Sequence, residues 1–421
     1  MREMKDSGVA WIGEIPADWV LERLQWHITE IKESNNPIKT KQVLSLTNKL
    51  GVIPYEEKGA QGNVSKENYN EYKLAYPGTI VANSMNILIG SVGICNYFGC
   101  VSPVYYVFKP NEGENLEFLN YLFQSEQFQK QLRQYANGIL EIRLRVSSSG
   151  ILKRLIALPS KDEQEAIVTF LNEKCGQIDI LIANQEAQIE KLKQYKQSLI
   201  TEVVTKGLNP DVEMKDSGVE WIGEIPNHWS ITRIKNLFEL RNERNFKPLE
   251  EVNLISLYTE QGVIQHSDIT ETTGNKAVNA DGYKLVYEDD IVVNIILCWM
   301  GAVGRSAYNG VTSPAYDVYK PLKDTYSRYF HYLFRTLRFN GECYRYGRGI
   351  MMMRWRTYSS EFRAINVPFP TIEEQKEIVA YLDEQCAKID KLIEIKQTKI
   401  AKLNEYKKSL IYEYVTGKKE A

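Results

Sequence analysis

Two long segments carry the clearest pattern of hydrophobic and polar positions. From Gln164 and again from Gln375, apolar residues recur at alternating steps of four and three for more than five heptads. Such steps keep residues on one helix face, and a run this long is typical of a coiled-coil seam. The predicted seam comprises Leu171, Ile178, Ile182, Ile189, Leu192, Leu199, Leu382, Ile389, Ile393, Ile400, Leu403 and Leu410.

Helix boundaries are marked as well. Each segment follows a proline (Pro159 or Pro370) and opens with an acidic turn, which the helix dipole favours. The first is expected to stop at Gly207, with Pro210 beyond it. About 45 residues at a rise of 1.5 Å give a rod of roughly 65 Å.

Before each helix, a region of about 140 residues, a usual domain size, has a different pattern. Short apolar runs at 43–47 and 254–258 are strand-like, and so are residues 72–83 and 283–294, which have a turn in the middle. Short helices are expected from Phe118 and Tyr329. We therefore predict strand-rich mixed α/β heads.

The chain is a tandem repeat. Residues 4–16 return almost unchanged as residues 214–226, and the copy continues to the end at an offset of 211. The repeat gives two similar surfaces in one molecule. The expected fold class is α+β, with strand-rich heads at 1–158 and 208–369 and long helices at 159–207 and 370–421.

Neither seam has a partner within its own repeat, so we expect the two helices to pair with each other. Antiparallel pairing is favoured because it makes the two repeats equivalent. Such a rod is long enough to hold two heads at least one DNA turn apart, about 34–36 Å. A role in dimerisation or in covering a core stays open. Four polar residues interrupt the apolar seam: Gln185, Lys196, Lys396 and Lys407. They either set the register of the helix pair or are tolerated as solvated positions, and we expect the lysines to be solvated.

Composition bounds the class of protein. An apolar fraction of 43% and a charged fraction of 25% are ordinary for a soluble protein. The first residues contain no apolar run, residues 291–300 are too short to span a membrane, and six cysteines show no framework spacing. We expect a cytoplasmic protein.

The net charge of −2 gives no global attraction to nucleic acid, but basic residues cluster twice. The clusters lie at corresponding places in the two repeats, between 128 and 156 and between 338 and 363. Either cluster alone suggests a solvated surface, whereas their recurrence favours phosphate contacts.

Catalytic motifs are missing from the sequence. It has no phosphate-binding Gly-x-x-x-x-Gly-Lys-Ser/Thr loop, no Gly-x-Gly-x-x-Gly and no Cys-x-x-Cys, and its four histidines stand alone. Residues 210–215 mimic a nuclease metal site, but the acidic residues are too close in sequence to come from separate strands. We therefore expect a binding subunit without a cofactor or metal of its own.

With these features, the chain resembles the specificity subunit of a type I restriction–modification enzyme over essentially its whole length. The resemblance rests on the paired openings that end at Trp19 and Trp229, the strands that end in Lys109-Pro110 and Lys320-Pro321, and the helix entries at 158–164 and 369–375. A departure is Ser160-Lys161, where the family often has a second proline.

The resemblance implies that each head reads one half of an interrupted target in double-stranded DNA. It also implies antiparallel helices that act as a spacer and dock two modification subunits, which carry S-adenosylmethionine. Two restriction subunits, which use ATP and Mg²⁺, would complete the complex. Membrane association is not implied.

Candidate DNA-binding residues come from comparing the repeats. Arginines that recur after a glycine loop are expected to bind phosphate, with a structural ion pair as the rival role. The asparagine that ends a strand in each repeat either caps the strand or touches a base. Loop residues complete the set: Lys66, Asn83, Asn86, Arg143, Arg145, Lys276, Asn294, Arg348, Arg354 and Arg356.

Two other classes of function compete. A self-contained methyltransferase or nuclease would need a catalytic motif. A coiled-coil scaffold with protein-binding heads would show no DNA affinity, whereas DNA binding should fall steeply with salt.

Overall fold

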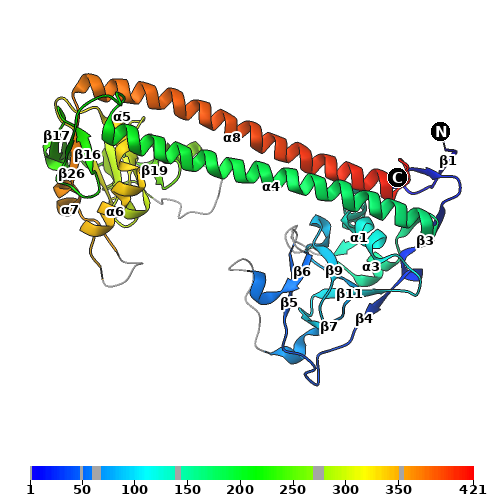
Figure 1. The fold of residues 1–421 in the computed structure, drawn as a ribbon. Coiled ribbons are helices and arrows are strands. Elements are labelled where there is room, and N and C mark those ends of the chain that lie inside the picture. The colour runs from blue at the N-terminus through cyan, green and yellow to red at the C-terminus, as the bar shows by residue number, and fades with distance from the viewer. Residues whose placement is uncertain (1, 48–50, 59–67, 138–143, 269–278, 350–354) are drawn as a thin grey trace. The chain divides into compact units, whose positions relative to one another are not determined.

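The computed structural model describes residues 2–47, 51–58, 68–137, 144–268, 279–349 and 355–421 (Figure 1). The chain forms two compact units. Unit 1 comprises residues 1–185 and 397–421, and unit 2 comprises residues 186–396. Each unit therefore contains one head, the start of that head's own long helix and the end of the other long helix.

The head of unit 1 is built on a four-stranded antiparallel sheet. Its strands, in sheet order, are β4 (Ile28–Ile31), β11 (Tyr105–Pro110), β8 (Thr79–Asn83) and β9 (Val92–Cys95). Five two-stranded sheets surround it: β1 (Met4–Asp6) with β2 (Glu14–Pro16), β3 (Val20–Arg23) with β14 (Leu155–Leu158), β5 (Leu44–Thr47) with β6 (Gly51–Pro54), β7 (Lys73–Ala75) with β10 (Gly99–Val101), and β12 (Ala136–Asn137) with β13 (Arg145–Val146). Its helices are α1 (Leu116–Gln124), α2 (Glu126–Leu132) and α3 (Ser148–Leu152).

The head of unit 2 repeats this plan. Its four-stranded sheet has the order β18 (Phe238–Leu240), β25 (Tyr316–Pro321), β22 (Ile291–Asn294) and β23 (Val303–Arg305). The smaller sheets pair β15 (Met214–Asp216) with β16 (Glu224–Pro226), β17 (Ser230–Arg233) with β26 (Asn366–Phe369), β19 (Ile255–Tyr258) with β20 (Gly262–Gln265), and β21 (Lys284–Val286) with β24 (Gly310–Thr312). The helices are α5 (Ser327–Phe334), α6 (Leu337–Tyr346) and α7 (Ser359–Ala364).

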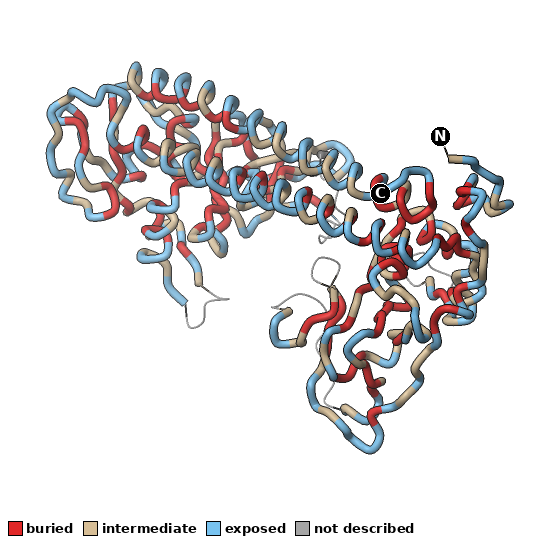
Figure 2. Tube along the Cα trace, turned by 45° about the vertical axis from the view of Figure 1, so that its right-hand side comes forward, coloured by how far each residue is buried: buried red, intermediate tan, exposed pale blue. Residues whose placement is uncertain are grey.

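Each head has a hydrophobic core on each side of its four-stranded sheet, and the head of unit 1 has a further small cluster of Tyr72, Leu74 and Cys100. The smaller core of unit 1 contains Leu44, Val81 and Val107, and the equivalent residues Ile255, Val292 and Val318 form the smaller core of unit 2. The larger cores also take in residues of the long helices. Figure 2 shows the buried positions concentrated inside the heads.

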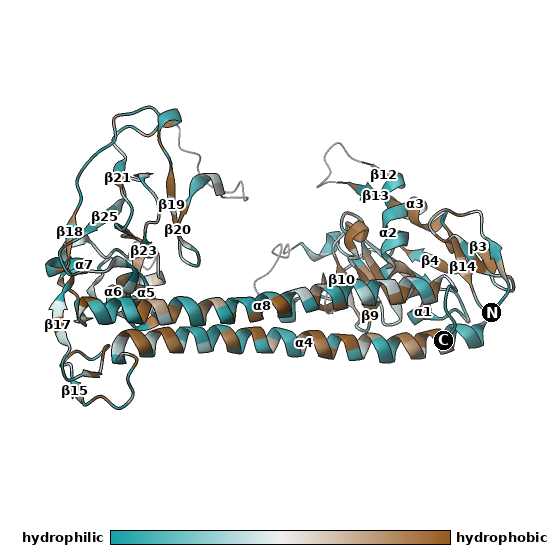
Figure 3. Ribbon diagram, turned by 90° about the horizontal axis from the view of Figure 1, so that it is seen from above, coloured by the Kyte–Doolittle hydropathy of each residue, from teal (hydrophilic) through white to brown (hydrophobic). Residues whose placement is uncertain are grey.

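The two long helices are α4 (Lys161–Lys206) and α8 (Ile372–Val415). All twelve predicted seam residues are buried or half-buried, while Ile180 and Ile395, outside the seam, are more than half exposed. Apolar and polar residues therefore alternate along both helices, as Figure 3 shows.

Within each unit the helix segments are antiparallel. In unit 1, Phe170 stacks on Tyr414 with ring centroids 4.4 Å apart, and Asp179 pairs with Lys407 at 2.7 Å. In unit 2, Lys196 pairs with Asp390, also at 2.7 Å. The residue numbers rise on one helix as they fall on the other, which confirms the predicted antiparallel pairing.

The two ion pairs correct one prediction. Lys196 and Lys407 are not simply solvated, because each is about three-quarters buried and bonds an aspartate of the opposite helix. Lys196 corresponds to Lys407 in the repeat, and Asp390 corresponds to Asp179, so the same ion pair occurs once in each unit. Half-exposed pairs contribute about 1 kcal/mol or less, and their value lies mainly in fixing the register.

The repeated opening motif closes each head onto its long helix. The indole Nε1 of Trp19 donates to Glu163, and that of Trp229 donates to Glu374, at 3.0 and 3.1 Å. Both tryptophans are almost fully buried. The tryptophans and glutamates lie 144 and 145 residues apart in sequence, so each opening and its helix entry form one structural element in the repeat.

The far end of each long helix packs into the other repeat's head. Val203 and Val204 lie in the larger core of unit 2, and Tyr414 and Val415 occupy the equivalent place in unit 1. Near the C-terminus, the Lys418 ammonium donates to the carbonyl of Ile12 at 2.7 Å. The first and last segments of the chain are therefore joined within unit 1.

Candidate nucleic-acid interface

In unit 1 the recurring arginine lies on a short hairpin that we call the first arm, made of β12 and β13. Asn137 pairs with Arg145 across it. The amide of Val146 donates to the carbonyl of Ser84 at 3.1 Å, and Tyr106 Oη donates to the carbonyl of Val146 at 3.1 Å. The first arm is thereby fixed beside the loop at 84–91 that follows β8.

The second arm, residues 347–349 and 355–357 in unit 2, has the same construction. Arg348 and Arg356 form an antiparallel bridge with backbone bonds of 2.9 and 3.1 Å. The amide of Thr357 donates to the carbonyl of Ile295 at 2.9 Å. Since Ile295 corresponds to Ser84, each head places an arm beside the same loop.

Arg145 and Arg356 are the exposed cations that the arms share. Neither side chain has an ion pair or hydrogen bond within the described parts of the chain. Arg348 differs, because it pairs with Glu361 and lies over the ring of Tyr358 at 5.7 Å. The rival role as a structural ion pair therefore suits Arg348 but has no support at Arg145 or Arg356.

The recurring asparagines have a local structural role. Asn83 and Asn294 are buried, and their side-chain oxygens accept from the amides of Met85 and Ile296, both at 3.0 Å. They shape the turn after the strand, so the capping alternative accounts for their recurrence. Asn86 in the same turn is exposed, and its side chain makes no bond to the described residues.

Four candidates lie outside the described residues: Lys66, Arg143, Lys276 and Arg354. A DNA contact by any of the four, as by the other candidates, stays a prediction. The exposed candidates without a side-chain partner among the described residues are Arg145 and Asn86 in unit 1 and Arg356 in unit 2.

Sequence comparison of the repeats missed an aromatic cluster at the second arm. Tyr344 stacks on Trp355 with centroids 5.0 Å apart, and Trp299 meets the edge of Tyr344 at 5.7 Å. A comparison that selects residues common to both heads does not detect a feature that is present in one head. The available signal was Trp355 beside Arg356, where the first repeat has Leu144 beside Arg145.

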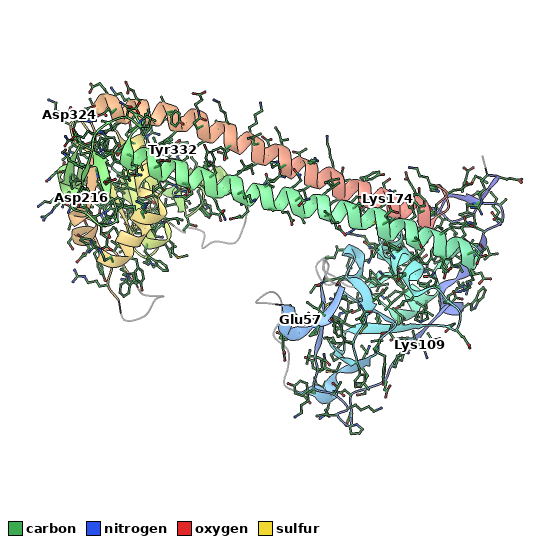
Figure 4. All side chains as sticks on the ribbon, in the orientation of Figure 1. Glu57, Lys109, Lys174, Asp216, Asp324 and Tyr332 are labelled. Carbon is green, nitrogen blue, oxygen red and sulfur yellow. The ribbon has the colours of Figure 1, made fainter. Side chains whose placement is uncertain are left out.

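A cavity of about 240 Å³ lies where α5 meets α8 in unit 2, near Tyr332 (Figure 4). Its two arginines are already paired, Arg305 with Asp289 at 2.5 Å and Arg328 with Asp383 at 2.6 Å. Burial, with help from neighbouring arginines, lowers the pKa of His331 to about 3, so that its ring is neutral. The cavity therefore offers no unpaired charge to a ligand.

Other chemistry is also lacking in the described parts of the chain. They contain no group of three or more His, Cys, Asp or Glu side chains placed to hold a metal ion. No helix in these described parts combines the length and the apolar character needed to cross a membrane.

Comparison with known proteins gives one consistent answer. The family model of the type I restriction modification DNA specificity domain matches residues 226–405. A putative type I restriction enzyme specificity subunit of Methanocaldococcus jannaschii is 25% identical, over 97% of this chain and 95% of its own length.

Two solved structures share the fold. The HsdS subunit from Thermoanaerobacter tengcongensis has a TM-score of 0.51 at 14% identity, over 96% of this chain and 98% of its own. A chain from a study of complex assembly and conformational transition of the type I restriction–modification system has a TM-score of 0.68 at 13% identity, over 95% and 98%. Residues 226–405 thus match the type I restriction modification DNA specificity domain, and the whole chain, with its duplicated heads and antiparallel helices, is similar to type I restriction enzyme specificity subunits.

Proposed function

We propose that each head reads one half of an interrupted target in double-stranded DNA and that the paired helices set the gap between the halves. The observation that carries this proposal is the pair of equivalent arms, each with an exposed arginine free of ion pairs in the described chain. Arginines of this kind bind phosphates and fix a protein on the duplex. Residues that differ between the heads would then supply the sequence readout.

On this proposal the chain is non-catalytic. Two modification subunits would supply S-adenosylmethionine and the methyl transfer, and two restriction subunits would supply ATP- and Mg²⁺-dependent translocation and cleavage. The support is the match of residues 226–405 to the specificity-domain family model together with the lack of catalytic motifs in the sequence.

The arms give the first test of DNA binding. Replacing both Arg145 and Arg356 with glutamate should weaken DNA binding at every sequence, because two phosphate contacts are lost. The slope of log affinity against log salt should fall by about 2, one for each contact. Fluorescence anisotropy with a labelled duplex over a salt series measures both quantities.

A matched control comes from the repeat itself. Arg23 and Arg233 are exposed and equivalent, and they lie on β3 and β17 rather than on the arms. Their double replacement with glutamate changes the net charge equally and should leave most of the affinity. Equal losses in both double variants, or none in either, would remove the arms from the interface. A chain with no salt-dependent DNA affinity would instead favour the scaffold alternative.

The same helices carry two equivalent apolar patches that suit a partner. Leu181 and Tyr406 are 44% and 55% exposed in unit 1, and their equivalents Leu392 and Tyr195 are 47% and 58% exposed in unit 2. Exposed leucine and tyrosine at matching places favour two copies of one partner. We assign these patches to the modification subunits.

The orientation of the patches agrees with this role. In unit 1, Asn172 accepts a hydrogen bond from Tyr121 of the head, and Leu181 lies nine residues further on, about 180° around the helix. In unit 2, Asp383 accepts from Tyr332, and Leu392 again lies nine residues further on. Each leucine therefore faces away from its own head, and a partner bound there would leave the arm uncovered.

Replacing Leu181 and Tyr406 with aspartate should remove one modification subunit from the complex. Adding the same changes at Leu392 and Tyr195 should remove both, because a docked apolar patch does not tolerate buried unpaired charge. Native mass spectrometry of the co-purified complex counts the subunits, and circular dichroism checks that the helices remain intact. Full occupancy in the fourfold variant would place the docking surface elsewhere.

A further inference from the structure

The head of unit 2 (head 2) carries a stack of aromatic rings at the base of its arm, and the described residues of the other head (head 1) show no equivalent stack. The rings of Tyr344 and Trp355 are nearly parallel, with an interplanar angle of 21°. The indole Nε1 of Trp355 donates to the carbonyl of Tyr344 at 3.0 Å, which holds the stack in place. Trp299 supports it from the edge. The rings are thus preorganised rather than loosely collapsed.

The stack is open to solvent rather than part of the core. Tyr344 is 42% exposed and Trp355 is half-buried. Met300 and Leu297, in the loop beside the arm, are also exposed. An ordered aromatic surface with this much exposure is unusual unless something covers it.

The surroundings of the stack are cationic. Arg356 follows Trp355 directly and is exposed, while Arg345 lies on the same helix as Tyr344 and is 61% exposed at its side chain. Glu342 pairs with Arg345 at 2.7 Å, but Arg356 has no such partner in the described chain. Aromatic faces interleaved with arginines suit a ligand that has both π-faces and phosphates.

The first head lacks every component of this stack. Arg133, Leu144 and Leu88 stand where the second head has Tyr344, Trp355 and Trp299. Room for the tryptophan also depends on Gly347, since a Cβ there would lie 2.4 Å from Trp355 Nε1, and the first repeat has Ala136 instead. Glycine and tryptophan thus form a matched pair of changes in the second repeat.

We propose that the Tyr344–Trp355 stack is a platform for an unstacked nucleobase of the DNA bound by head 2. This inference rests on the proposed DNA-binding function and adds to it a contact that head 1 does not make. A base that leaves the duplex loses stacking energy, and an exposed aromatic face beside the arm replaces it. Head 2 then favours DNA in which a base is unpaired, whereas head 1 relies on its polar and charged contacts.

The test compares two probes with the full-length chain assembled with its modification subunits. One probe is a fully paired 30-base-pair duplex, and the other is the same duplex with one unpaired thymidine. Stacking of one base corresponds to a preference of roughly 5- to 100-fold for the unpaired probe. Replacing Trp355 with leucine, the residue of head 1, should reduce this preference to less than about twofold without lowering the melting temperature of the chain.

Leu144→Ala in head 1 is the matched control and should keep the full preference. A second readout replaces the unpaired thymidine with 5-iodouracil, whose photo-cross-link should map to the peptides that contain Tyr344 or Trp355. Retained preference in the Trp355→Leu variant, or a cross-link elsewhere, overturns the inference. A parallel loss of affinity for both probes with a lower melting temperature also overturns it, because the stack then only stabilises the arm.

Failure of the platform is separable from failure of the proposed function. If the platform fails while the Arg145 and Arg356 variants still lose affinity, the heads bind DNA without it. If neither set of variants changes DNA binding, the proposed interface itself is wrong.

Discussion

Exchange of residues 20–155 for the first head of a type I specificity subunit is expected to change one half of the DNA target and leave the other half unchanged. The physical reason is that each head has its own hydrophobic cores and its own arm, so that its contacts with DNA are built within one unit. The boundaries preserve the Trp19–Glu163 bond that closes the head on α4. Sequencing of methylated sites in a host that expresses the hybrid complex measures both halves.

The reciprocal exchange of the second head, residues 230–366, is the control, and it should change only the other half. A hybrid in which both halves change would mean that the two heads read the target jointly. A hybrid that folds and methylates the original target would mean that neither head determines the sequence.

Insertion of one heptad at equivalent places, after Ala187 in α4 and after Thr398 in α8, is expected to lengthen the gap and keep both half-sites. Seven residues preserve the seam because its period is 3.5 residues. They add about 10 Å of helix, or about three base-pair steps. Because the half-sites must also keep their angle around the duplex, we expect a gap that is longer by about one to three base pairs.

A variant in which seven exposed residues at the same places are replaced without a change of length should keep the original gap. An unchanged gap in the lengthened protein, despite intact helices, would show that the helices do not set the spacing. Loss of methylation with no new motif would point to disruption of the helix pair, which circular dichroism detects.

The helices were the part of the fold most accessible from sequence. Steps of three and four through Leu171, Ile178 and Leu382 place these side chains on one face of each helix, so that the seam followed from periodicity. The antiparallel direction did not, because it was favoured only for making the two repeats equivalent. The lysines at 196 and 407 were misjudged because their partners, Asp390 and Asp179, are distant in sequence. Ion pairs across a seam depend on the register, which periodicity does not provide.

The heads were predictable only in outline. Their strands are three to six residues long, apart from the two-residue pairs in the first arm, and their pairing joins segments such as β3 and β14 that are more than 130 residues apart. Local pattern does not determine such pairing. The structure was needed to see that Trp19 and Glu163, both in repeated motifs, form one bond.

Comparison of the two repeats predicted the exposed arginines of the candidate site. Recurrence selected Arg145 and Arg356, which the structure leaves exposed. The same rule selected Asn83 and Asn294, which are buried turn residues, because recurrence reports shared structure as readily as shared function. Features present in one head, such as Trp355, are found by comparing the repeats for residues that differ.

The most direct test of the central claim is methylome sequencing of a host that expresses this chain with its modification subunits. The account predicts one bipartite motif, with two unrelated half-sites separated by a fixed gap, that disappears when the chain is omitted. Methylation that does not depend on this chain, or a single uninterrupted motif, would contradict it.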